Sequence, residues 1–110
     1  MGIIKPSDGV IFADSATEEA FNSLPENDWL KKAIERAIEK LKENVFTGQK
    51  IKNELIPKEY VKKYRVNNIW WYPLPNAWRL IYSIAADKVE ILAVIIEYMD
   101  HKNYERRFNY

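Results

Sequence analysis

The chain has 110 residues, a length that fits one domain over residues 1–110 with a hydrophobic core of its own. It has no cysteine, which excludes disulfides, thiolate zinc sites and cysteine nucleophiles. The content of 47% hydrophobic and 30% charged residues, with a net charge of +1, is typical of an ordinary globular protein.

Two segments bear on where the protein is found. Residues 1–6 lack the basic and then apolar pattern of a secretory signal peptide. The longest apolar run, residues 89–99, is interrupted by Glu90 and Glu97 and has about half the length that a membrane helix needs. We therefore expect a cytoplasmic protein without a membrane span.

The chain begins with a predicted strand and a predicted short helix. Residues 10–13 are a short apolar run that suits a strand. Ser15 followed by Glu18 fits a capping box, which predicts a helix that continues to about Leu24.

A second, longer helix is predicted over residues 26–44. Apolar side chains recur there at three- and four-residue spacing, while Lys, Glu and Arg occupy the other positions. Gly48 is the expected end of this amphipathic helix. Because Pro25 stops or turns the chain between the two helices, we expect them to form a helical hairpin.

Residues 49–63 have an irregular pattern and predict an ordered loop, in which Pro57 could open a helical turn. This region and its end carry a cluster of basic side chains: Lys50, Lys52, Lys58, Lys62, Lys63 and Arg65. The excess of positive charge indicates either a phosphate-facing strip or a solvated surface.

Three runs typical of strands follow, separated by turn-like residues at hairpin spacing. They cover residues 66–74, 77–85 and 89–98. We predict from them an antiparallel meander of three strands, with the N-terminal strand alongside the last one. Residues 91–96 are apolar at every position, as in a central strand covered on both faces. The predicted fold class is α+β.

This order of elements resembles the RelE/ParE toxin superfamily of type II toxin-antitoxin systems, and the likeness extends over nearly the whole chain. Residues 74–82, Leu-Pro-Asn-Ala-Trp-Arg-Leu-Ile-Tyr, resemble the second hairpin of the family. Residues 100–104, Asp-His-Lys-Asn-Tyr, are similar to its post-strand motif, and residues 104–110 to the short tails of archaeal-type members. The resemblance implies a RelE-like fold: an N-terminal strand, an α-helical hairpin, a three-stranded meander and a short C-terminal helical tail.

The resemblance also implies a function. Such a protein would be a toxin and a ribosome-dependent mRNA endonuclease, an mRNA interferase, with messenger RNA on the ribosome as substrate and a cognate antitoxin as partner. Cleavage by the 2′-hydroxyl of the RNA needs a base, an acid and cations around the phosphate, so neither a metal nor a cofactor is expected. Since the superfamily also contains gyrase poisons and members without known toxicity, the alternative is a non-catalytic member that binds a protein partner. A generic RNA-binding module is a third hypothesis.

The resemblance implies that Arg79 corresponds to the family arginine that binds the scissile phosphate. A guanidinium suits this role because it offers two parallel donors to phosphate oxygens. Its alternative role is a sheet-surface arginine paired with a carboxylate. His101 has the only side chain with an ordinary pKa near neutrality, and Tyr104 follows one helical turn later, so the two are candidates for proton transfer and for stacking on a base. A histidine that caps a strand end is the other reading. Arg65 is a candidate for flanking phosphates.

One departure from the family pattern concerns the strand before Arg79. Active ribosome-dependent members carry lysines there, whereas this chain has Trp70 and Tyr72. Proton transfer would then fall to Tyr72, His101 or Tyr98. The candidates for RNA binding are Lys50, Lys52, Lys58, Lys62, Lys63, Trp70 and Tyr72. Because neighbours on a strand face opposite ways, at least one of Trp70 and Trp71 is also a candidate contact for a partner.

Overall fold

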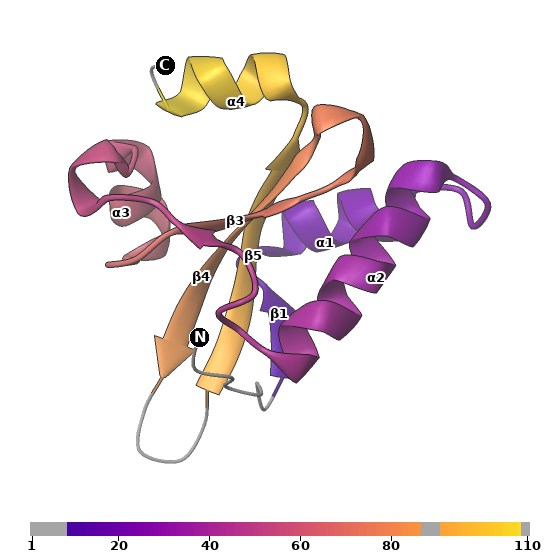
Figure 1. Cartoon of the computed structure of the whole chain (residues 1–110), viewed down its shortest axis with the longest axis horizontal. Helices are drawn as coiled ribbons and strands as arrows, with labels where there is room; N and C mark the ends of the chain where they lie inside the picture. Colours follow the sequence, from indigo (N-terminus) through magenta and orange to yellow (C-terminus); the bar gives the residue numbers. More distant parts are fainter. Residues whose placement is uncertain (1–8, 87–90, 109–110) are drawn as a thin grey trace.

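The computed structural model describes residues 9–86 and 91–108, and these form an α+β fold, as predicted. Four α-helices surround a five-stranded mixed sheet with the strand order β1-β5-β4-β3-β2 (Figure 1). The elements in chain order are β1 (Gly9–Phe12), α1 (Ser15–Asn22), α2 (Trp29–Glu43), β2 (Gln49–Lys50), η1 (Asn53–Leu55), α3 (Lys58–Tyr64), β3 (Trp70–Pro73), η2 (Pro75–Ala77), β4 (Arg79–Ala86), β5 (Ile91–Met99) and α4 (His101–Phe108).

The sheet is larger than the predicted meander. Strands β3, β4 and β5 pair in antiparallel order, and β1 lies parallel to β5 at one edge, as expected from the sequence. The two residues of β2 add a further antiparallel strand beside β3 at the other edge. The predicted turn at residues 87–88 and the predicted strand start at residues 89–90 lie outside the described residues.

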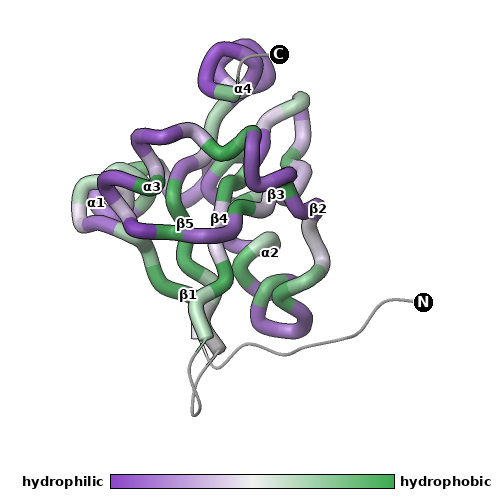
Figure 2. Tube along the Cα trace, turned by 90° about the vertical axis from the view of Figure 1, so that its left-hand side faces the viewer, coloured by the Kyte–Doolittle hydropathy of each residue, from purple (hydrophilic) through white to green (hydrophobic). Residues whose placement is uncertain are grey.

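Helices α1 and α2 cover one side of the sheet, which we call the hairpin face (Figure 1). Its core is mainly aliphatic, because the apolar stripe of α2 packs against alternate residues of β4 and β5. The buried residues include Leu30, Ala33, Ile34, Ala37, Leu41, Leu80, Ala93 and Ile95. Figure 2 shows the same order, with hydrophobic strands inside and largely hydrophilic helices outside.

Helices α3 and α4 cover the other side, which we call the α4 face. Its core is richer in aromatic rings, and Tyr60, Tyr104 and Phe108 from the two helices pack against Ile81 and Ile96 of the sheet. The Tyr104 and Phe108 rings stack with 4.5 Å between their centroids. Residues 91–96 were predicted to form a central strand covered on both faces. Ile95 packs in the core of the hairpin face and Ile96 in the core of the α4 face, which confirms this prediction.

The helix starts differ from the sequence prediction. The cap of α1 is Asp14 rather than Ser15, because the Asp14 carboxylate accepts a hydrogen bond of 2.8 Å from the Thr17 N–H. Helix α2 begins at Trp29, three residues later than predicted. Asp28 caps it by accepting from the Leu30 N–H at 2.8 Å, while the Asp28 N–H donates to the Pro25 carbonyl and closes a turn.

Helix α2 ends at Glu43 with Asn44 as its C-cap, as predicted from the range 26–44, but Gly48 takes no part in its end. Instead the Gly48 N–H donates to the Tyr82 hydroxyl at 3.1 Å, and this hydroxyl donates to the Val45 carbonyl at 2.8 Å. A Cβ on Gly48 would lie 2.7 Å from the Tyr82 oxygen. Glycine is therefore required for the close approach of the chain to Tyr82, and burial raises the pKa of that tyrosine to about 12.

The predicted loop over residues 49–63 is more ordered than expected. It contains β2, η1 and the helix α3, which starts at Lys58 directly after Pro57. Strand β3 is also shorter than the predicted run over residues 66–74. The reason is Asn68, whose side-chain amide donates to the Ile84 carbonyl at 2.9 Å and accepts from its N–H at 2.8 Å. A side chain thus replaces the backbone partner that a longer β3 would provide.

A β-bulge interrupts the pairing of β4 with β5. From Ala86, which pairs with Ile91, back to Tyr82, which pairs with Ile95, the two strands keep one register. The next residue of β4, Ile81, pairs with Glu97, so Ile96 has no partner of its own in β4 and is the additional residue. Ile96 and Glu97 consequently both face α3 and α4, although they are neighbours in the chain.

Candidate functional site

Arg79 lies at the start of β4, on the α4 face, where it pairs with Met99. Its guanidinium carbon is 3.9 Å from the centroid of the Trp71 ring and 4.2 Å from that of Tyr104. Both are cation–π contacts, and the two rings meet each other edge to face, with 6.5 Å between their centroids and 62° between their planes. Within the described residues no carboxylate pairs with Arg79, so the ion pair considered from the sequence is not found there.

Trp71 and Tyr104 come from different elements, and both contact Arg79. Trp71 shares the α4 face because it pairs with Ile81. Tyr104 is 0% exposed, since α4 presses it against the sheet and against Phe108. A buried ring cannot stack on an incoming base, so Tyr104 acts here as a residue that positions Arg79.

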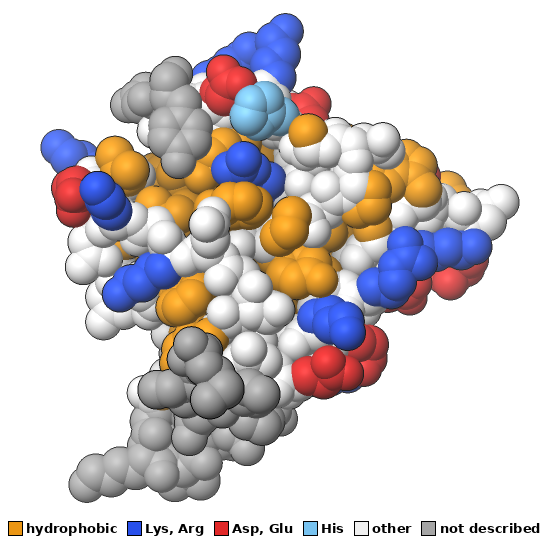
Figure 3. All heavy atoms as spheres, in the orientation of Figure 1, with side chains coloured by type: hydrophobic (Ala, Val, Ile, Leu, Met, Phe, Trp, Pro, Cys, Tyr) orange, Lys and Arg blue, Asp and Glu red, His pale blue; other side chains and the backbone are white. Residues whose placement is uncertain are grey.

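His101 is the first residue of α4, two positions after the partner of Arg79 in β5. Its Nε2 atom is 2.5 Å from a carboxylate oxygen of Glu105, and its side chain is 50% exposed. Asp100 fixes the start of this helix by accepting from the Asn103 N–H at 2.9 Å. His101 and Arg79 are therefore brought to the same end of the sheet. In Figure 3 the histidine lies near the upper end, beside basic and acidic side chains.

Arg65 lies at the opposite end of β4. It ends α3 with a left-handed backbone, φ 55° and ψ 38°, and lines a hollow of about 330 Å³ together with Ser83 and Ile84. From Arg79 to Ile84 the strand advances by roughly 16 Å, at about 3.3 Å per residue. The structure therefore does not bring Arg65 together with Arg79.

Tyr98 points to the hairpin face, away from Arg79, because of the β-bulge. If the register of Ala86 with Ile91 continued unbroken, Tyr98 would pair with Arg79; the additional residue in β5 shifts that pairing to Met99. Tyr98 is opposite Leu80 instead, and burial raises its pKa.

Trp70 and Tyr72 also lie on the hairpin face. Trp70 stacks on Tyr82 with 6.2 Å between the ring centroids and meets Phe46 at 5.5 Å, while Tyr72 is half-buried against the same core. Trp70 and Tyr72 are thus separated from Arg79 by the sheet itself.

The basic residues predicted to bind RNA do not form one cluster. Lys50 and Lys52 are exposed at β2, whereas Lys58 and Lys62 are exposed on α3. Lys63 is 3.3 Å from the Asp14 carboxylate. Hydrogen bonding to Tyr64, and then to Asp14, raises the pKa of Lys63.

A cluster of charged side chains between α3 and α4 was not anticipated from the sequence. The buried Tyr60 hydroxyl donates to Glu97, and Arg107 is 2.6 Å from Glu59 and 3.6 Å from Glu97. Burial, and next the hydrogen bond to Glu97, raises the pKa of Tyr60 well above its ordinary range. The only hint in the sequence was the possible helical turn after Pro57, which places Tyr60 on one face of α3.

Charge is distributed unequally between the two halves of the chain. Residues 9–48, which form the hairpin side, contain eight acidic and five basic side chains. Residues 49–86 and 91–108 contain ten basic and five acidic ones. Most of the positive charge therefore belongs to the half of the chain that carries Arg79 and His101.

Neither a group of metal-binding side chains nor a membrane-spanning helix is present in residues 9–86 and 91–108. They contain no group of three or more His, Asp and Glu side chains that could hold a metal ion. None of their helices is both long and apolar enough to cross a membrane. Comparison with protein-family models, with curated proteins and with solved structures finds no match for this chain.

Proposed function

We propose that this chain is a RelE-like toxin that cleaves messenger RNA on the ribosome, with the scissile phosphate bound to Arg79. The observation that supports it most is the position of the Arg79 guanidinium between Trp71 at 3.9 Å and Tyr104 at 4.2 Å. Arg79 is half-buried and pairs with no carboxylate within the described residues, which leaves the N–H groups at the edge of its guanidinium for a ligand. A phosphate accepts two parallel hydrogen bonds from such an edge.

The proposed reaction uses the 2′-hydroxyl of the RNA as nucleophile. A base removes its proton, the 2′-oxygen attacks phosphorus, and the bond from phosphorus to the 5′-oxygen breaks, which leaves a 2′,3′-cyclic phosphate. An acid returns a proton to the leaving 5′-oxygen. We assign proton transfer to His101, whose imidazole is oriented by Glu105 at 2.5 Å, and charge stabilisation to Arg79.

Exposed lysines near the same face would hold the neighbouring phosphates. Those that we assign to this role are Lys58, Lys62 and Lys102. Their contribution is electrostatic and does not depend on the base sequence, so it weakens as the salt concentration rises. A cognate antitoxin would inhibit the toxin by covering Arg79 and these lysines.

Induced expression in a bacterial host tests the proposal with the Arg79→Met variant. Methionine keeps an unbranched side chain between the two rings but cannot bind phosphate. We expect the wild-type chain to arrest growth and to create 5′ ends inside codons, and the variant to cut roughly 100-fold less. Arg36→Ala, an exposed arginine of α2, is the matched control. Undiminished cleavage by a folded Arg79→Met protein would contradict the proposal.

The second candidate is a non-catalytic member of the superfamily that binds a protein partner. It is favoured by the separation of the predicted catalytic residues, since Tyr98 lies on the hairpin face and Arg65 at the far end of β4. A wild-type chain that leaves RNA intact but blocks DNA supercoiling by gyrase would support this candidate. A folded wild-type chain with neither effect would point to an inactive toxin.

A further inference from the structure

Strand β1 covers only part of the edge of β5. Their pairing runs from Gly9 with Leu92 to Phe12 with Ile95, and the last bond is from the Ala13 N–H to the Ile95 carbonyl at 2.8 Å. Residues 97–99 continue beyond this point with β4 on one side and no described strand on the other. Figure 1 shows β1 beside only one end of β5.

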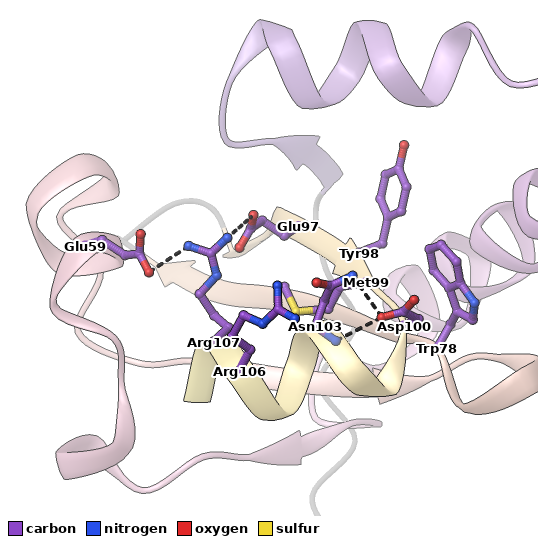
Figure 4. Close-up of a pocket in the computed structure, with 9 residues that line it drawn as sticks. All are labelled: Glu59, Trp78, Glu97, Tyr98, Met99, Asp100, Asn103, Arg106 and Arg107. Carbon is purple, nitrogen blue, oxygen red and sulfur yellow. Dashed lines mark hydrogen bonds and ion pairs between the residues drawn. The ribbon is translucent and has the colours of Figure 1, made fainter. Parts of the chain in front are cut away.

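A hollow of about 500 Å³ lies along this open edge (Figure 4). The consecutive residues Glu97, Tyr98, Met99 and Asp100 all line it. Side chains of neighbouring strand residues point to opposite faces, so a hollow that touches every one of them meets the strand edge-on. At such an edge, alternate residues direct their N–H and C=O groups outward.

We propose that this hollow, which we call the β5 notch, receives an extended segment of a partner protein that pairs with residues 97–99 as an added strand. The segment would take the place next to β5 that β1 leaves open after Ile95. Main-chain hydrogen bonds would provide the affinity, and the side chains around the notch would select the sequence.

The charges around the β5 notch indicate one preferred side chain. Arg107 is already paired with Glu59 and Glu97, and the Asp100 carboxylate accepts two hydrogen bonds of 2.9 Å from Asn103. Arg106 is exposed and has no carboxylate partner within the described residues. It therefore fits an acidic side chain of the bound segment.

The opposite wall of the β5 notch is aromatic. Trp78 and Tyr98 belong to the hairpin face, and Figure 4 shows Tyr98 directed away from Arg107. An added strand alternates its own side chains in the same way, so one set meets the two rings while the other meets Arg106. The recognised segment is therefore one in which apolar residues alternate with polar ones and an acidic residue lies on the Arg106 side.

The same residues disfavour a nucleic acid as the occupant. Arg107 is already paired with Glu59 and Glu97, so among the described residues the β5 notch offers the single cation Arg106, which suits one carboxylate and not a run of phosphate groups. A strand edge also offers a regular ladder of donors and acceptors that peptide groups match and nucleotides do not. A protein segment satisfies both conditions.

Selection of ten-residue peptides from a random display library against the full chain tests the proposal. We expect enriched peptides with alternating apolar residues and an acidic position. Methylation of alternate backbone nitrogens should abolish their binding. Amide hydrogen exchange of residues 97–99 should slow at least tenfold in the complex, and Arg106→Ala should weaken binding by about tenfold. The matched control Arg36→Ala should bind normally.

Three results would overturn the proposal. They are the absence of any enriched peptide, protection of residues outside 97–99 by the enriched peptides, and protection of residues 97–99 by a single-stranded RNA oligonucleotide. The proposal is independent of the RNA cleavage proposed above. Arg79→Met should bind the peptides normally, and Arg106→Ala should retain RNA cleavage, so failure of one proposal can be told from failure of the other.

Discussion

The two faces of the sheet differ in the side chains that pack against them. The hairpin face buries aliphatic side chains such as Ile34 and Leu41 under a regular amphipathic helix, and residues 9–48, which include its two helices, carry eight acidic and five basic side chains. The α4 face buries the rings of Tyr104 and Phe108, which pack beside the partly exposed Arg79 and Arg107, and its side of the chain is basic. The first arrangement buries a continuous apolar stripe, whereas the second places charged side chains beside aromatic rings.

This difference implies an unequal division of stability. Burial of aliphatic surface contributes directly to the free energy of unfolding. The ion pairs of the α4 face are partly exposed, and such pairs contribute about 0–1 kcal/mol each. The docking of α4 therefore depends mainly on the two buried rings of Tyr104 and Phe108.

The largest effect on stability is expected from Ile34→Ala, in the centre of the hairpin face. Ile34 is 0% exposed, so truncation leaves a cavity and should lower the free energy of unfolding by about 3 kcal/mol. Urea denaturation followed by circular dichroism measures the loss. Ile38→Ala, at the partly buried edge of the same helix, should cost less than half as much; equal losses would mean that the hairpin face is not the main source of stability.

Phe108→Ala tests the α4 face in the same way. Phe108 is 3% exposed and stacks on Tyr104, but it lies in the last helix, which can detach without unfolding the rest. We expect a global loss of about 2 kcal/mol or less. Amide exchange of α4 should accelerate at least tenfold while that of α2 is unchanged. Lys102→Ala is the exposed control in the same helix, and equal acceleration in α2 would show that the two faces unfold together.

A smaller, pH-dependent effect is expected at Asp14, which connects the two faces. It caps α1 and also contacts Tyr64 and Lys63 of α3. The hydrogen bond from the Thr17 backbone amide, with smaller contributions from Tyr64 and Lys63, lowers the Asp14 pKa from 3.8 to about 2. A lowered pKa in the folded state means stability that is fully present above pH 3.8 and lost as the pH falls toward 2.

Asp14→Asn checks this effect, because asparagine can still cap the helix but does not titrate. The variant should be less stable than the wild-type chain at pH 6, by about 1 kcal/mol. The difference should shrink between pH 4 and pH 2, as urea midpoints at several pH values would reveal. A difference that stays constant over this range would exclude a titrating Asp14 as its cause.

The repeating patterns of the sequence account for most of the fold. The spacing of apolar residues in α2 and the alternation in β4 were clear signals, because α2 buries one continuous stripe and β4 buries one face in the core beneath the hairpin. Strand β2 and the shortened β3 were missed, since a two-residue pairing has no periodicity and Asn68 replaces a backbone partner with its side chain. Ser15 was mistaken for the cap of α1 because Asp14 has equal capping ability and lies one position earlier.

The candidate site was predicted less completely. The chain order was enough to bring Arg79 and His101 to one end of the sheet. It did not reveal that Tyr104 is buried, because burial depends on how α4 docks and not on the helix alone. It also did not reveal that Arg65 lies a strand length away, since the path of the chain through α3 and residues 65–69 carries no periodic signal.

The β-bulge of β5 decides which residues are neighbours at the end of the sheet that carries Arg79 and His101. From Ala86 to Tyr82 the pairing with β5 keeps one register; from Ile81 to Arg79 each residue of β4 meets a partner one position further along β5. If the register of Ala86 with Ile91 continued through Ile96 without the bulge, every following residue of β5 would turn to the opposite face of the sheet. Glu97 would then point into the apolar core beneath the helical hairpin, and Tyr98 would lie opposite Arg79. The face on which Glu97 and Tyr98 lie thus depends on one additional residue in the pairing of β5 with β4.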